Sequence, residues 1–200
     1  MNARNWVRLF FSTLIIGGFA GMVTGLLVEL ELYKGIADFA VLGLWLFGVS
    51  CIFSLISQMG FFAYLTVHRF GLGIFRTVTL WNAVQIVLIA FVLFDLVYLR
   101  YTAFAEPGEA IWSYVVPALI LFLIALIVAY LKQKETNRSA FVPALFFMTV
   151  VTTLEWFPVL RANDPSWVTI MFVVLVVSNG WQIMLLHRLT GQKAKPLNQS

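Results

Sequence analysis

The chain has 200 residues, of which 62% are hydrophobic and 11% charged, and its mean hydropathy is +0.94. A water-soluble fold could not hide so many apolar side chains, so the composition excludes a soluble globular domain and predicts a protein surrounded by lipid. Lysine and arginine exceed aspartate and glutamate by 13 to 9. These basic residues lie at the ends of apolar segments, which is typical of membrane topology and not of nucleic-acid binding.

Six charge-poor apolar segments follow one another along the chain, joined by short connections. A helix that crosses a bilayer needs about 20 mostly apolar residues, so we expect an all-α polytopic bundle that forms a single transmembrane domain over residues 1–200. The expected spans are 7–28, 39–67, 78–99, 111–131, 141–160 and 167–186, with a short basic tail over 187–200. The first span is too long for a signal-peptide core and lacks a cleavage pattern, so we expect it to be retained.

The second and fifth spans depart from the usual length. The second is longer than a bilayer requires, so we expect it to tilt, to protrude or to break near residues 58–60. The fifth is short and contains Pro143, Glu155 and Pro158. Its composition therefore leaves open whether it crosses the membrane or re-enters from one side.

The basic residues predict the orientation, because lysine and arginine close to span ends stay in the cytoplasm. Ten of the 13 fall on one face: Arg4, Arg8, Arg69, Arg76, Lys132, Lys134, Arg138, Arg188, Lys193 and Lys195. The other face has Lys34, Arg100 and Arg161, together with the acids Glu29, Glu31, Asp38, Glu106, Glu109 and Asp164. We therefore expect a multi-pass protein of a bacterial cytoplasmic membrane with both termini inside.

Glycine recurs every fourth residue in the first span, at Gly17, Gly21 and Gly25. A helix face without side chains lets another backbone approach closely. This seam could join a partner or a second copy of the chain, but five other helices are available within the molecule. Packing inside the molecule is therefore the favoured interpretation, and formation of a homo-oligomer is left open.

Two acids, Asp95 and Glu155, lie inside apolar segments at similar expected depth. A charge placed there costs at least about 2.5 kcal/mol on insertion scales, so something must offset the cost. Ion pairing with Arg100 and Arg161 near the outer interface, or snorkelling toward water, is the simpler explanation. A ligand-sensing or cation-linked pocket is the alternative.

A second polar set lies toward the inner side of the expected bundle. Its members are Gln58, Asn82, Gln85, Asn179 and Gln182. Asparagine and glutamine three residues apart share one helix face in both WNAVQI and SNGWQI, so the third and sixth spans could hydrogen-bond to each other. Such amides contribute about 0.6 kcal/mol on average inside bilayers, which favours a role in fixing helix register over catalysis.

Enzyme signatures are missing from the sequence. It has two histidines, His68 and His187, both near the expected inner interface, and one cysteine. It has no zinc-protease motif, phosphate-binding loop or nucleophile elbow. We therefore expect no catalytic residues, no metal site and no cofactor.

Three stretches carry a resemblance to a known family: RNWVRLFF, WLFGVSCIFSLISQMGFFAYLTVHRFGLGIF and LWNAVQIVLIAFVLFDLVYLRY. They resemble the KinB-signalling pathway activation family, KbaA, of endospore-forming bacteria, most strongly over the first half of the chain. The resemblance implies a small polytopic membrane protein that promotes signalling through the membrane sensor histidine kinase KinB at the onset of sporulation. The implied partner is this kinase, with membrane lipids around both.

The expected inner loop, residues 67–77, is one place where such a partner could bind. It combines the basic side chains with two aromatic ones: His68, Arg69, Phe70, Phe75 and Arg76. Anchoring to lipid headgroups explains the same composition equally well. For the whole chain, a non-enzymatic accessory of the kinase is the leading hypothesis, and a small-solute transporter or channel-like protein is the alternative.

Overall fold

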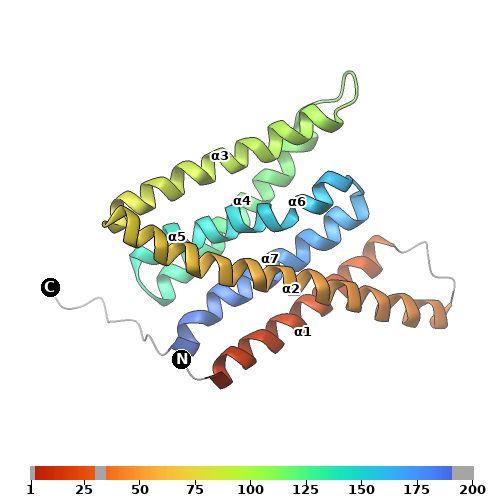
Figure 1. Cartoon of the computed structure of the whole chain (residues 1–200). Coiled ribbons are helices and arrows are strands. Elements are labelled where there is room, and N and C mark those ends of the chain that lie inside the picture. Colours follow the sequence, from red (N-terminus) through yellow and green to blue (C-terminus); the bar gives the residue numbers. More distant parts are fainter. Residues whose placement is uncertain (1–2, 30–34, 191–200) are drawn as a thin grey trace.

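The computed structural model describes residues 3–29 and 35–190, and this part of the chain is helical with no strand (Figure 1). The long helices are α1 (Ala3–Val28), α2 (Ile36–Phe75), α3 (Val78–Phe104), α4 (Trp112–Glu135) and α7 (Pro165–Thr190). Between α4 and α7 the chain forms a 3-10 turn (Arg138–Ala140), α5 (Phe141–Phe146), a π-helical turn (Phe147–Val151) and α6 (Thr152–Ala162). Residues 187–190, expected as the start of the tail, instead belong to α7. The rest of the tail and Lys34, on which part of the orientation argument rests, lie outside the described residues.

Six helical segments are long and apolar enough to cross a membrane, which confirms the expected all-α class. The fifth of them, Arg138–Ala162, is continuous and 25 residues long. In its most apolar stretch 61% of the residues are buried, against 22% to 44% in the other five. The fifth segment is therefore the most buried of the six, with α2, α3, α4 and α7 packed against it.

The second helix is much longer than a bilayer requires. It has 40 residues, which corresponds to about 60 Å and is about twice the thickness of the hydrocarbon core. It runs through residues 58–60 without a break, so tilt or protrusion must accommodate its length. The segment 67–77, expected as a loop, is helical as far as Phe75, and only Arg76 and Thr77 connect α2 to α3.

A tight turn explains why this connection is so short. Arg76 adopts a left-handed conformation with φ of 57°, and the Thr77 hydroxyl accepts a hydrogen bond from the Leu80 amide at 3.3 Å to cap α3. The Trp81 ring lies over Gly71, where any side chain would collide with it. These contacts let the apolar sequence continue as helix to the end of α2.

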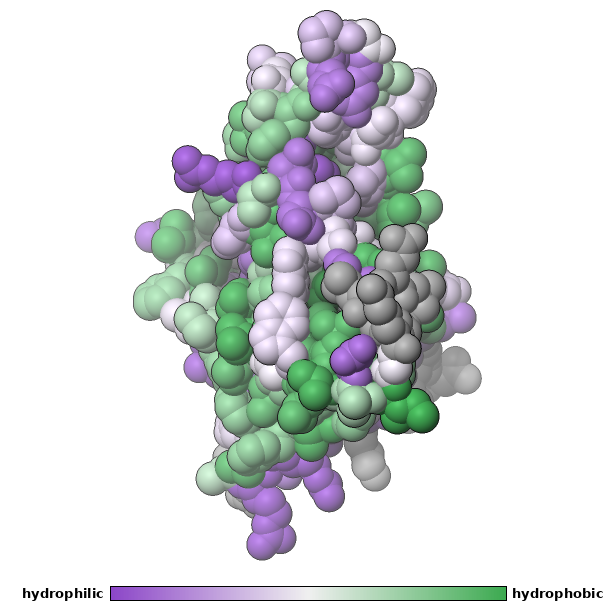
Figure 2. Space-filling model, turned by 90° about the vertical axis from the view of Figure 1, so that its right-hand side faces the viewer, coloured by the Kyte–Doolittle hydropathy of each residue, from purple (hydrophilic) through white to green (hydrophobic). Residues whose placement is uncertain are grey.

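Successive spans run in opposite directions along the bundle. The start of α1, the α2–α3 turn, the α4–α5 connection and the end of α7 lie at one end (Figure 1). Figure 2 views the opposite end, and it shows hydrophilic residues gathered at the top, over the α3–α4 connection, with hydrophobic surface below them. The sides of the bundle expose large apolar side chains such as Leu44, Val41 and Met59. Apolar flanks of this extent are rare in soluble monomers and suit a lipid environment.

The glycine face of α1 packs inside the molecule. Gly17, Gly21 and Gly25 face, in order, Ser54, Ser50 and Leu46 of α2. A Cβ atom added at Gly17 would lie 2.7 Å from the Ser54 Cβ and 2.5 Å from the Ser178 Oγ of α7. The absence of side chains on this face thus allows α1 to approach both α2 and α7 closely.

Candidate functional site

Glu155 lies in the first turn of α6, and only 7% of its surface is exposed. Its Oε2 atom accepts a hydrogen bond from Asn179 Nδ2 of α7 at 2.6 Å. The same amide nitrogen donates to Thr152 Oγ1 at 3.0 Å. Because Thr152 and Glu155 are three residues apart on one helix face, a single amide of α7 holds two side chains of α6.

The network continues from α7 to α2. Ser57 donates to Asn179 Oδ1 at 2.8 Å, and Gln182 Nε2 donates to Ser57 Oγ at 2.8 Å. These three side chains are buried. The central polar network, defined here as Ser57, Thr152, Glu155, Asn179 and Gln182, therefore ties together α2, α6 and α7.

Sequence reasoning identified some members of this network and missed others. It singled out Glu155, Asn179 and Gln182, but the partners it offered for the two amides were those of the third span. It missed Ser57 and Thr152, because single hydroxyl residues are common in membrane helices. The spacing of Ser54 and Ser57, three residues apart in α2, was the available signal.

The amides of α3 and Gln58 of α2 lie apart from the network. Gln85 is fully buried next to the Tyr64 hydroxyl, yet neither end of its amide forms a hydrogen bond of good geometry among the described residues. The same holds for Asn82 Oδ1 and Gln58 Nε2. In this structure, then, the polar residues of α3 do not hydrogen-bond to those of α7.

The helix that carries Glu155 is irregular on both sides of it. A π-helical turn, Phe147–Val151, precedes α6, and such turns often occur at functional sites. Pro158 follows three residues after Glu155, and its missing N–H leaves the Leu154 carbonyl without its usual helical donor. The acid therefore lies on a short regular segment between two local departures from α-helical geometry.

The second carboxylate oxygen of Glu155 lies against α2. Oε1 is buried and has no hydrogen-bond partner in the described part of the chain. It occupies the space in which Gly60 would carry a side chain, so a Cβ there would overlap it. Gly60 thus allows α2 to cover an acid whose hydrogen-bonding capacity is only half used, which is costly inside a membrane.

Two hollows lie on either side of α6. The α3 hollow, between α3 and α6, has a volume of about 660 Å³ and is lined by Asp95, Arg100 and Arg161 among others. The α2 hollow, between α2 and α6, has a volume of about 450 Å³ and is lined by Gly60 and Glu155 among others. Leu154 lines both. The two acids therefore face different hollows, separated by the ridge of α6.

Neither acid forms an ion pair within residues 3–29 and 35–190. Arg100 instead donates through Nη2 to Asn163 Oδ1 at 3.1 Å, and its guanidinium lies 5.6 Å from the centre of the Tyr114 ring. Arg161 is exposed at the end of α6. Both arginines line the α3 hollow together with Asp95, and they lie closer than Asp95 to the ends of their helices.

An ion pair between Glu135 and Arg188 forms at the other end of the bundle, where α4 meets α7. Glu135 lies 3.2 Å from His187 Nε2 and 3.0 Å from Arg188 Nη2. Lys132 is buried and donates to the Ile183 carbonyl at 2.6 Å. Sequence reasoning counted these residues only as topology signals, and their spacing at the ends of two spans was the clue to their pairing.

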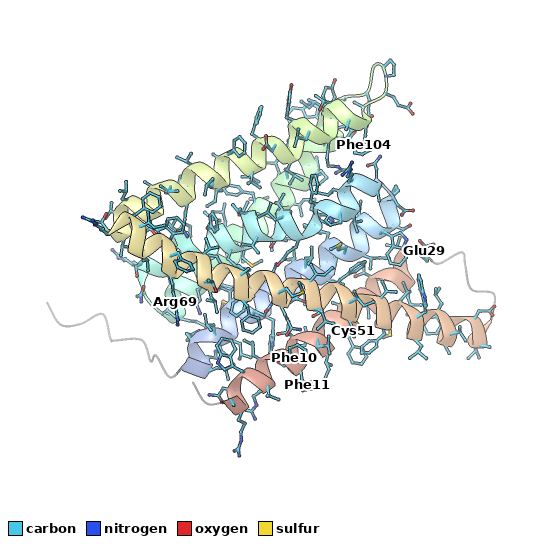
Figure 3. All side chains as sticks on the ribbon, in the orientation of Figure 1. Phe10, Phe11, Glu29, Cys51, Arg69 and Phe104 are labelled. Carbon is cyan, nitrogen blue, oxygen red and sulfur yellow. The ribbon has the colours of Figure 1, made fainter. Side chains whose placement is uncertain are left out.

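The end of α2 and the turn after it have a buried side and an exposed side. His68 Nδ1 accepts a hydrogen bond from Trp81 Nε1 at 3.0 Å, and Phe75 stacks on the same tryptophan. Arg69, which is labelled near this end of α2 in Figure 3, is exposed, as are Phe70 and Arg76. His68 and Phe75 thus close the hairpin, while the other three remain available to lipid or a partner.

Comparison with known proteins covers most of the chain. The model of the family KbaA, described as KinB-signalling pathway activation in sporulation, matches residues 17–189. A protein of Bacillus subtilis (strain 168) named KinB-signaling pathway activation protein is 43% identical over an alignment of 195 residues, which covers 94% of this chain and 98% of that protein. No solved structure matches the chain. The resemblance seen in the first three spans is confirmed over almost the whole sequence, and the chain belongs to the KbaA family.

Proposed function

We propose that this chain is a non-enzymatic accessory protein of the bacterial cytoplasmic membrane that promotes activation of the sensor histidine kinase KinB in the sporulation phosphorelay. The observation that carries the proposal is the family match over residues 17–189 in a chain with six apolar helices. The connection between α2 and α3 consists of two residues and leaves no room for a soluble domain. Contact with the kinase is therefore expected within or next to the bilayer.

A cytoplasmic location of both termini is part of this proposal. The inner end of the described bundle carries the Glu135, His187 and Arg188 cluster and the exposed Arg69 and Arg76. An excess of basic residues at one end is the pattern that retains that end in the cytoplasm. The cytoplasmic part of the kinase would then lie next to this basic end of the bundle.

The buried polar groups support a structural and recognition role more than catalysis. Glu155 hydrogen-bonds to an amide, and both histidines are engaged elsewhere, His68 with Trp81 and His187 with Glu135. A nucleophile activated by a side chain needs a general base within hydrogen-bonding reach. The central polar network does not supply this pair among its own members.

A small-solute transporter is the second candidate, favoured by the π-helical turn and the polar network in the fifth segment. Transporters often bind their substrates where helices are interrupted near the middle of the membrane. Purified protein in liposomes would separate the two functions. Solute uptake above that of empty liposomes, combined with normal kinase signalling in cells that lack the protein, would favour transport.

The direct test is deletion of the gene in a spore-forming host in which KinB is the sensor kinase that drives a sporulation reporter. We expect reporter output to fall and to be restored by the wild-type gene, while a reporter driven by a different sensor kinase stays unchanged. Equal output with and without the gene would refute the proposal. The soluble kinase domain is the control, because its autophosphorylation in solution should not require this protein.

A further inference from the structure

The bundle is open on one side, between α2 and α3. These helices leave the turn at Arg76 and Thr77 and diverge toward the other end of the molecule, with α6 seen between them (Figure 1). α6 contacts both of them, yet its outer face remains uncovered, since Leu154 is 65% exposed and Phe157 is 51% exposed. Leu154 lines both the α2 hollow and the α3 hollow, and Phe157 lines the α3 hollow, so the two side chains form a ridge on α6 next to both hollows.

Each hollow contains a hydrogen-bond acceptor without a donor. Asp95 is half-buried in the α3 hollow and has no hydrogen bond within the described ranges. Glu155 Oε1 lies at the wall of the α2 hollow and is also unpartnered there. Asp95 lies four residues past the middle of α3 and Glu155 five residues past the middle of the fifth span, so both lie within the apolar part of their spans, where a polar group without a partner is costly.

Arg100 and Arg161 also line the α3 hollow, and their charge is opposite to that of an ionised acid. Arg161 is exposed and donates no hydrogen bond to the described residues, and the buried Arg100 Nε also lacks an acceptor among them. Arg100 lies five residues beyond Asp95 in α3, which is about 7.5 Å along the helix. Most side chains that line the opening are thus apolar. The carboxylate oxygens without hydrogen-bond donors lie nearer the middle of the spans, and the arginine N–H groups without acceptors lie nearer their ends.

We propose that the opening between α2 and α3 is the docking site for a transmembrane helix of the partner. That helix has an apolar face that packs against Leu154 and Phe157, a hydrogen-bond donor at the depth of the two acids, and an acidic or other acceptor group one to two turns closer to the surface. Donors and acceptors that hydrogen-bond between helices are known to stabilise helix association in bilayers. The inference rests on the proposed function, which makes KinB the partner.

A phospholipid fits the opening less well. Its phosphate would match Arg100 and Arg161, but its acyl chain offers no donor to Asp95 or Glu155. Glu155 Oε1 is covered by Gly60, so a donor reaches it only when the carboxyl group turns or α2 shifts. Docking in the α2 hollow would therefore act directly on the contact between α2 and α6, whereas Asp95 is accessible without such a change.

Photocrosslinking from inside cell membranes tests this site. A benzophenone amino acid replaces Phe157 on the ridge or, as a matched control, Phe11 of α1, which is 55% exposed and lies on the side of the molecule away from α3 (Figure 3). With epitope-tagged KinB in the same membranes, we expect a KinB adduct from position 157 and none from position 11. Asp95→Asn should lower its yield about tenfold at unchanged abundance, because a charge-assisted hydrogen bond becomes a neutral one.

Adducts from position 157 that contain only lipid or a second copy of this chain would overturn the proposal. So would equal KinB adducts from positions 157 and 11, or an undiminished yield with Asp95→Asn. The deletion experiment separates this failure from that of the proposed function. If deletion lowers KinB-dependent output while position 157 gives no KinB adduct, the function stands and the docking site is wrong.

Discussion

Glu155 of α6 lies directly against Gly60 of α2, and its Oε1 atom occupies the space that a side chain at position 60 would fill. Its other oxygen is held by Asn179 of α7. The carboxyl group thus sits where three helices meet. Its position depends on a residue without a side chain in a helix otherwise rich in large apolar residues.

This contact makes Gly60→Ala a destabilising change, although alanine is the better helix former by about 1 kcal/mol. The new methyl group must displace the carboxyl group and disturb its bond to Asn179, and overpacking of this kind costs about 1–3 kcal/mol. Gly48→Ala, in the same helix, is the matched control, because nothing lies within 4 Å of a Cβ there. Thermal unfolding in detergent should show a lower Tm for Gly60→Ala than for Gly48→Ala, and equal values would contradict the close contact.

The separation of the two acids predicts additive effects on stability. Asp95 and Glu155 line different hollows on opposite sides of α6, and they share no hydrogen-bond or ion-pair partner among the described residues. Glu155→Gln should cost about 1 kcal/mol, since the amide keeps hydrogen bonding but alters the match to Asn179. The double change with Asp95→Asn should equal the sum of the single changes within about 0.5 kcal/mol.

Unfolding measurements on both single variants and the double variant decide this point. If the loss of stability in the double variant differs from the sum of the two single losses by much more than about 0.5 kcal/mol, the two acids act as one site. Membrane abundance measured in the same cells is the control for expression.

The glycine face of α1 predicts a strong effect of Gly21→Leu. A side chain at this position would collide with Ser50 and Val174, so α1 would have to move away from α2 and α7. Gly35→Leu is the control, because an added Cβ at Gly35 meets nothing within 4 Å. Thermal unfolding of the proteins purified in detergent should show a clearly lower Tm for Gly21→Leu alone. A similar lowering of the Tm in both variants would rule out close packing at Gly21.

The orientation can be tested with reporter fusions. An enzyme that is active only outside the cytoplasmic membrane should be silent when fused after Ser200 and active when inserted at Gly108, in the connection between α3 and α4. The physical reason is the retention of basic residues near span ends on the cytoplasmic side. A cytoplasmic reporter at the same two positions should give the reverse pattern, and activity of the first enzyme after Ser200 would refute the proposed topology.

The sequence by itself determined that this is an all-helical chain with six apolar segments and a glycine face on the first of them. These features are local. In lipid each span must satisfy its own backbone hydrogen bonds, so a run of about 20 apolar residues is enough to predict a helix. Family membership was also readable, because it rests on the order of residues along the chain.

Only the tertiary structure decided which side chains meet. Leu121 is fully buried and Leu123, in the same helix, is 57% exposed, yet nothing in the residue type distinguishes them, since apolar side chains face both lipid and the bundle interior. The partners of Asn179 were hidden for the same reason, and so was the division of Asp95 and Glu155 between two hollows. The rotation of each helix and its neighbours depend on close packing against all the others, and that packing is a property of the whole bundle, which no single span encodes.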